Sequence, residues 1–184
     1  MKTVLRRTAV FGLLAATTAA VAQPPAGGRG PAPTGRGGPG GGRGRGAAPP
    51  EPSLLTWEQA VTMMEAAEKY TNDKDWQMSI RIVDQNNNIL MIHRLNNVNP
   101  FTINVTEMKT TTVTATKMSS AEYAEKLAAG EIEEVEGGAN FGGGVPIYLG
   151  GQFIGAIAAS GGSPAEDEEV ARAGVEAIGA STSM

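Results

Sequence analysis

The sequence predicts an α+β domain in which two β-hairpins form an antiparallel sheet packed with helices, in the order α-β-β-α-α-β-β-α. Three observations support this fold class. First, capping motifs mark the starts of helices. Second, two pairs of strand-like segments are each separated by turn residues. Third, apolar residues at helical spacing occupy the segments before, between and after these pairs. We place the domain at residues 53–184, and a chain of 184 residues has room for one such unit.

The first helix is predicted to begin at Thr56-Trp57-Glu58-Gln59, a capping box in which the Thr and Gln side chains satisfy free amides. Apolar residues continue at helical spacing to about Tyr70. Residues 78–83 then alternate in the pattern of a strand with one buried face, residues 84–88 supply a turn, and residues 89–93 return. This segment is therefore predicted to be a β-hairpin.

Residues 101–118 are rich in Thr, Val and Ile, which favours a strand by propensity. The spacing of the larger and apolar residues instead predicts one face of a helix, made of Phe101, Val105, Met108, Thr112 and Ala115. Ser119 or Ser120 is expected to cap a short helix through residues 127–129, which Gly130 closes in a left-handed conformation.

The second half contains an acidic segment at residues 131–136, expected to be exposed, and a Gly-rich loop at residues 137–144. Residues 145–149 and 152–159, separated by Gly150-Gly151, predict a second hairpin with a two-residue primed turn. The Gly-rich loop lacks the strand and helix context of a dinucleotide site and has no P-loop lysine. Tight backbone packing is the better explanation of its glycines.

Pro146 has no amide hydrogen, so its strand should be at an edge of the sheet, or Pro146 should begin it.

The last helix is expected to start at Ser163-Pro164, with the cap and first-position proline typical of a helix start, and to run to Ile178. The acids at residues 166–169 are interpreted as a solvated first turn that complements the helix dipole, and not as a metal cluster.

Residues 1–22 are typical of a signal peptide, because three cations precede a mildly apolar run over residues 8–20 and a small-residue cleavage site at residues 20–22. The run is shorter than a membrane-spanning helix requires. A periplasmic or extracellular location is expected, by general secretion or, given the Arg6-Arg7 pair, by twin-arginine export.

Residues 23–52 are predicted to be a disordered linker rich in Gly, Pro and Arg. The alternative is an Arg/Gly nucleic-acid-binding segment, but the linker has only four arginines and no aromatic residue. Seven of the 15 cations lie in residues 1–50, which contain no acid, so residues 51–184 carry eight cations against 19 acids, a formal net charge of −11. Such a domain repels nucleic acid and anionic membranes.

The absence of cysteine excludes disulfides, thiolate metal sites and a thiol nucleophile, and a single histidine excludes centres that need two imidazoles. No serine lies in a recognisable nucleophile motif. We therefore expect a binding protein more than an enzyme, and leave catalysis open.

Two long motifs in the second half resemble the GlcG/HbpS-like haem-binding family, also called haem-degrading. They are Gly143-Gly144-Val145-Pro146-Ile147 and Ser160-Gly161-Gly162-Ser163-Pro164-Ala165-Glu166-Asp167, with Ser163 where the family usually has Thr. Upstream, residues 79–84 resemble the family's first strand, although the turn at residues 84–88 replaces its usual Asp-Ala-Gly-Gly. The likeness covers roughly residues 54–178.

The resemblance implies a haem-binding, sequestering or sensing module, oligomeric, with weak haem degradation as an accompanying activity and a sensor or surface protein as a partner. Haem iron needs an axial ligand, and the propionates need cations. His93, the sole imidazole, is the candidate metal ligand, with Arg94 and Lys109 as propionate partners. His93 is equally consistent with a plain surface residue at a strand end, and Met91, Tyr70, Tyr123 and Tyr148 are lesser ligand candidates.

The alternative function is a non-haem accessory module of the same fold. It would take a small organic acid or a protein partner near the Gly-rich loop. The colour of the purified protein distinguishes the two hypotheses.

Overall fold

The computed structural model describes residues 51–184 and confirms the predicted fold class, with four helices and a four-stranded antiparallel sheet in the expected order. The predicted signal peptide, and the linker up to residue 50, lie outside the described residues. The elements are α1 (Trp57–Asp73), β1 (Ser79–Asp84), β2 (Ile89–Arg94), α2 (Thr102–Thr116), α3 (Ser120–Ala128), β3 (Gly144–Leu149), β4 (Gln152–Ser160) and α4 (Pro164–Ala177).

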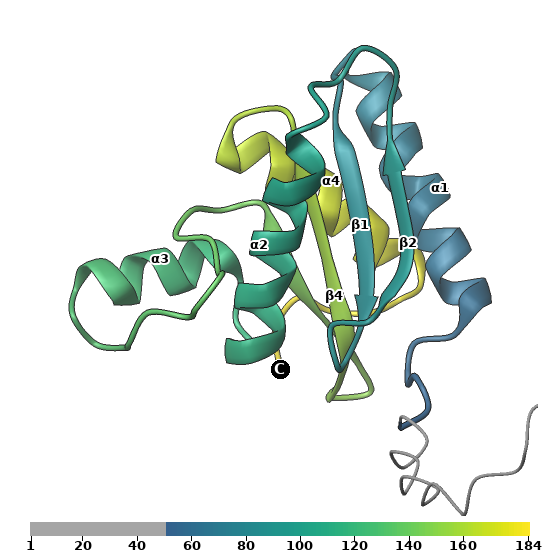
Figure 1. Ribbon diagram of the computed structural model, residues 1–184. Helices are drawn as coiled ribbons and strands as arrows, with labels where there is room; N and C mark the ends of the chain where they lie inside the picture. The colour runs from purple at the N-terminus through teal and green to yellow at the C-terminus, as the bar shows by residue number, and fades with distance from the viewer. Residues whose placement is uncertain (1–50) are drawn as a thin grey trace, which may run out of the picture. The chain divides into compact units, whose positions relative to one another are not determined.

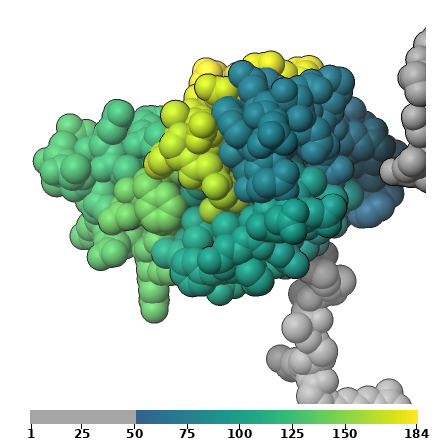
Figure 2. All heavy atoms as spheres, turned by 90° about the horizontal axis from the view of Figure 1, so that it is seen from above, coloured from purple at the N-terminus to yellow at the C-terminus, as the bar shows by residue number. Residues whose placement is uncertain are grey.

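The strands are arranged in the order β2-β1-β4-β3, so the first strand of one hairpin pairs with the second strand of the other. Ile82 of β1 stands opposite Met91 of β2 on one side and Ile157 of β4 on the other. Helices α1 and α4 cover one face of this sheet and α2 covers the opposite face, as Figure 1 shows. Helix α3 and the acidic segment after it project to one side of the domain (Figure 2).

The main core lies between the sheet and the α1–α4 pair. Its large apolar members come from α1, β1, β3, β4 and α4 and from the residues before α1 and β1: Leu55, Met63, Met64, Met78, Ile80, Ile82, Val145, Ile147, Ile154, Ile157, Val170 and Val175. The face under α2 holds a much smaller apolar cluster of Val83, Val113 and Ala156, with Phe153 packed against it. Polar side chains fill much of the rest of the α2 face.

Local signals in the sequence set the ends of several elements as expected. Thr56 and Ser163 each form a complete capping box. Gly150 and Gly151 both have positive φ, 59° and 82°, which is the primed turn predicted for the second hairpin. Pro146 lies in β3, an edge strand, where no neighbour needs its missing amide hydrogen.

Two predictions about buried faces were wrong. All six residues of β1 are buried, because helices cover both faces of this central strand. In α2, Thr112 is the only one of the five predicted face residues that is buried, and Phe101 is 62% exposed. The buried residues of α2 are Thr106, Lys109, Thr110, Thr112 and Val113.

The buried threonines of α2 are tolerated because each hydroxyl bonds to a carbonyl of the same helix. Thr106 donates to the Ile103 carbonyl, and Thr110 donates to that of Glu107. No buried hydroxyl of these residues is left without a partner.

Among residues 51–184, no helix combines the length and apolar character that crossing a membrane requires.

Candidate functional site

His93 lies near the end of β2, on the sheet face that α1 covers. Its Cα partner in β1 is Ile80, a core residue, and its ring reaches α1, where Nδ1 lies 2.5 Å from Oε1 of Glu68. The His93 side chain is 49% exposed and that of Glu68 is 29% exposed. The imidazole is therefore held against α1 while remaining open to solvent.

The contact with Glu68 determines what the His93 ring can do. A carboxylate oxygen can only accept a hydrogen bond, so Nδ1 carries the proton and Nε2 is the nitrogen left with a lone pair in the neutral ring. A carboxylate bonded to one ring nitrogen is the usual second partner of a histidine that binds metal through the other. The contact with Glu68 thus leaves Nε2 of the chain's one histidine as the ring nitrogen that could accept a hydrogen bond or bind a metal.

The neighbours of His93 along β2 alternate between the two faces of the sheet. Met91, two residues away and half-buried, is on the same face as His93. Arg94 is on the opposite face, where Nη1 donates to the carbonyl of Val98 at 2.5 Å. The structure therefore does not direct His93 and Arg94 toward one point, although both side chains are exposed.

Lys109 lies in the interior, between α2, the end of β4 and the start of α4. Its Nζ donates to Oδ2 of Asp167 at 2.6 Å and to the carbonyl of Ala159 at 2.8 Å. The Lys109 side chain is 1% exposed, and the other Asp167 oxygen accepts from the amide of Gly162. Lys109 is therefore far from solvent and already paired, and it does not lie beside His93.

Burial dominates the electrostatics of this ion pair. Burial lowers the pKa of Lys109 and raises the pKa of Asp167, because it disfavours both charged forms. The attraction between the two charges acts in the opposite direction on each pKa but is the smaller effect. The pair joins α2 to the loop and helix start that carry the Ser160–Asp167 motif.

The interpretation of residues 166–169 as a solvated turn is wrong for Asp167, because only 3% of this residue is exposed. The signal that sequence reasoning missed is its spacing: Asp167 falls on the same helical stripe as the buried Val170, Ala171 and Gly174. An acid on an apolar stripe requires a buried cation. Glu68 was also missed, since its role depends on a contact with a strand 25 residues away.

The backbone of the Gly-rich loop is tightly packed, as predicted, and the structure shows that it packs against the buried Lys109–Asp167 pair. Gly143 has φ of +113°, and a Cβ atom there would collide with Nζ of Lys109 and Cβ of Asp167. The amide of Gly144 donates to Oγ of Ser120. The loop therefore has a packing role here.

The three tyrosine hydroxyls are each engaged within the chain. Tyr70 donates to Glu169, and Tyr148 donates to the carbonyl of Lys117. The hydroxyl of Tyr123, a buried side chain, accepts from the amide of Val135. Binding iron through the phenolate of Tyr70 or Tyr148 would lose the hydrogen bond that each phenol donates, and Tyr123 is buried.

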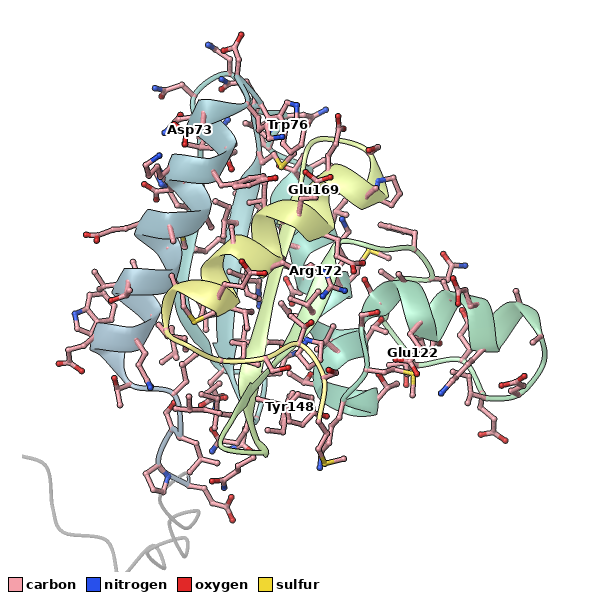
Figure 3. All side chains as sticks on the ribbon, turned by 180° about the vertical axis from the view of Figure 1, so that it is seen from behind. Asp73, Trp76, Glu122, Tyr148, Glu169 and Arg172 are labelled. Atoms are coloured by element: carbon pink, nitrogen blue, oxygen red, sulfur yellow. The ribbon has the colours of Figure 1, made fainter. Side chains whose placement is uncertain are left out.

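A surface cavity of about 370 Å³ opens beside the Gly-rich loop. Its lining combines small residues from α3, the loop and α4 with three charged side chains: Ala121, Gly142, Pro164, Ala165, Glu168, Glu169 and Arg172. Figure 3 shows Glu169 and Arg172 along α4. Arg172 is bonded to Glu168, so the lining is net negative, which opposes the binding of an organic acid.

Comparisons with known proteins agree with the resemblance noted in the sequence. The HbpS-like family, described as "Haem degrading protein HbpS-like", matches residues 55–176. Protein GlcG of Escherichia coli (strain K12) is 25% identical over 109 residues, 58% of this chain and 81% of GlcG.

Two solved structures share the fold. A double mutant of Streptomyces reticuli HbpS is 26% identical with a TM-score of 0.64, and the match covers 78% of this chain and 98% of that one. The crystal structure of a PduOC:haem complex is 22% identical with a TM-score of 0.66, over 71% of this chain and 99% of that one.

Proposed function

The chain belongs to the HbpS-like family, and from this premise we propose that it is a haem-binding protein whose iron ligand is Nε2 of His93. The observation that supports this proposal is the His93–Glu68 contact, which engages Nδ1 and orients the imidazole while 49% of the His93 side chain remains exposed. Haem, when bound, would supply the redox and gas-binding chemistry of its iron.

The residues around His93 fit this role. Glu68 orients the ring, as carboxylate partners of metal-binding histidines do. Met91, on the same face of β2, is partly buried against the main core, and we propose that its remaining surface contacts the hydrocarbon part of the porphyrin. The tyrosines fit less well, because each phenol already has a hydrogen-bond partner.

Arg94 is our proposed partner for a propionate, although its side chain lies on the opposite face of β2 from His93, so the propionate would have to reach around this edge strand to meet it. Arg94 is exposed, sits next to His93 in the edge strand, and bonds within the chain to one backbone carbonyl. Lys109, the other cation suggested for this role, acts in the described conformation as the partner of Asp167. We therefore expect Arg94 to matter for haem affinity and Lys109 to matter for stability.

The experiment is a haemin titration of the full-length chain, followed by the Soret band. We expect a saturable shift at one haem per chain for the wild type. His93→Ala should abolish the shift, and Glu68→Gln should weaken haem binding about 10- to 100-fold, the usual effect of removing a second partner of a metal-binding histidine.

Tyr70→Phe is the control, since it removes an exposed phenol and leaves the imidazole intact, and its titration should match the wild type. No Soret shift in the wild type would refute haem binding. A Soret shift that His93→Ala retains would support haem binding but reject His93 as the iron ligand. Loss of the Soret band after adding a reductant in air would reveal haem degradation.

We propose that the protein is exported, and that a sensor or surface protein is its partner outside the cytoplasm. The support is the cationic and apolar pattern of residues 1–22. The mature protein should then begin at Gln23. Mass measurement of protein recovered from the periplasm or medium tests this, and a mass that includes residues 1–22 would contradict it.

A further inference from the structure

Arg81 is a buried cation with few partners among the described residues. It lies in the central strand β1, and only 5% of the residue is exposed. Its Nε is buried and has no hydrogen-bond partner within residues 51–184, and Nη1 makes one long bond of 3.4 Å to Oε2 of Glu107. A guanidinium has five N–H donors, and burying a charge is unfavourable unless it is paired. The contacts of Arg81 within the domain therefore do not explain why a cation is buried there.

A second buried group in the same region also lacks a partner. Asn87 lies in the turn between β1 and β2, and its Nδ2 donates to Oγ1 of Thr111 at 3.2 Å, but its Oδ1 is buried and accepts no hydrogen bond. Within residues 51–184, Oδ1 of Asn87 and Nε of Arg81 are the two buried side-chain atoms that have no hydrogen-bond partner. One hairpin thus holds an unused acceptor and an unused donor.

Both side chains contact the same side of α2. Arg81 reaches Glu107 and Asn87 reaches Thr111, four residues further along the helix. Residues four apart lie on one side of a helix and are separated by about 6 Å along its axis. The unused donor and the unused acceptor therefore belong to side chains that meet α2 about one helical turn apart.

The part of the sheet beside this region is open to solvent. Figure 1 shows α2 and, next to it, β2 with no helix of the described residues in front of it. Ile92 is the cross-strand partner of Arg81 and is 40% exposed, and Ile89, the partner of Val83, is 53% exposed. Directly paired residues lie on the same face of a sheet. An exposed apolar surface therefore adjoins the buried guanidinium.

From these observations we infer that a small carboxylate that also carries a hydroxyl group binds between the β1–β2 hairpin and α2. Its carboxylate pairs with Arg81, its hydroxyl donates to Oδ1 of Asn87, and its carbon chain lies against Ile92. Arginine binds carboxylates through two parallel N–H donors, and a separation of about 6 Å along α2 suits a molecule of a few carbon atoms.

Glu107 is the side chain that the ligand displaces. It is 58% exposed, and its contact with Arg81 is long, so moving it into solvent costs little. Its carboxylate competes with that of the ligand for one guanidinium, so removing its charge should strengthen binding. The site lies on the α2 face of the sheet, opposite the face of His93, and its occupancy does not depend on haem.

The first experiment is isothermal titration calorimetry of the full-length chain at pH 7 with 3-hydroxybutyrate and with butyrate, which lacks the hydroxyl group. We expect both acids to bind, and butyrate to bind about fivefold more weakly, the usual effect of losing one neutral hydrogen bond. Arg81→Met should abolish the binding of both acids. Lys126→Met, the control, removes an exposed cation far along the chain in α3 and should bind both acids as the wild type does.

Two further variants test the roles of Asn87 and Glu107. Asn87→Gly removes Oδ1 but keeps the backbone, because glycine readily adopts the φ of 63° found at this position. We expect this variant to bind the two acids with equal affinity. Glu107→Gln should bind both acids at least threefold more tightly than the wild type, a gain that a purely structural role of Arg81 would not produce.

No heat of binding from the wild type with either acid at up to about 10 mM would overturn the inference. Equal affinity of the wild type for the two acids, unchanged binding by Arg81→Met, or a preference for 3-hydroxybutyrate that Asn87→Gly retains would also overturn it. If Arg81→Met fails to fold, Glu107→Gln decides, and an affinity no higher than that of the wild type would reject the site.

Discussion

Replacing Lys109 with Met tests how the buried ion pair supports the domain. Met replaces the lysine stem as far as Cε, so packing of the stem changes little. Asp167 loses its cation while its side chain stays 5% exposed, and the carbonyl of Ala159 loses its donor. Removing one partner of a buried pair typically destabilises by about 3–5 kcal/mol. Asp167 keeps its bond from the Gly162 amide, so we expect the lower end, about 3 kcal/mol.

The double variant Lys109→Met, Asp167→Asn should recover much of this loss. Burial shifts both pKa values toward the neutral forms, so removing the charged groups from water costs free energy at Lys109 and at Asp167. Asn also retains an oxygen for the Gly162 amide. We expect the double variant to lie within about 2 kcal/mol of the wild type, because exchanging both charges for neutral groups is often nearly neutral.

The assay is urea unfolding of the full-length chain at pH 7, followed by circular dichroism. The Asp167→Asn single variant is measured too, so that the four proteins form a double-mutant cycle. A loss below about 1 kcal/mol for Lys109→Met would refute the reasoning, as would a double variant whose loss equals the sum of the two single losses.

Three further predictions use the same unfolding assay. Gly155→Ala should destabilise by about 3 kcal/mol, because its Cβ would collide with the carbonyl of Val83 in the paired strand, and an unchanged midpoint would contradict this. Arg81→Met should change stability by less than about 1 kcal/mol, because the 5% exposed Arg81 has an unpaired Nε and one 3.4 Å contact to Glu107; a large loss would show that this contact matters. The hydrogen bond from the Ser163 amide lowers the pKa of Glu166, so its stabilising effect is present above the carboxyl's ordinary pKa and is lost as pH falls through the lowered value. The stability gap between wild type and Glu166→Gln should therefore shrink below about pH 4.5, and a constant gap from pH 3 to 7 would contradict this.

The family and the order of elements were accessible from the sequence because they depend on local patterns. The capping boxes at Thr56 and Ser163 and the turn at Gly150-Gly151 are decided within a few residues. Helical spacing correctly outweighed the strand propensity of the Thr-rich second helix.

The buried face of that helix was not accessible, because it depends on what the helix packs against. Apolar spacing indicated a face containing Phe101 and Met108, whereas the sheet receives Lys109 and several threonines. A buried lysine is stable there because Asp167, 58 residues later, supplies its counter-charge.

The sequence by itself determined which residue types were available: one imidazole, no thiol, and motifs that carry the family and its fold. The tertiary structure decided how those residues are used. It held His93 against Glu68, separated it from Lys109, and buried Arg81 with few partners. The reason is physical: capping, turns and periodicity act over a few residues, whereas ion pairs, burial and strand edges depend on segments that only folding brings together.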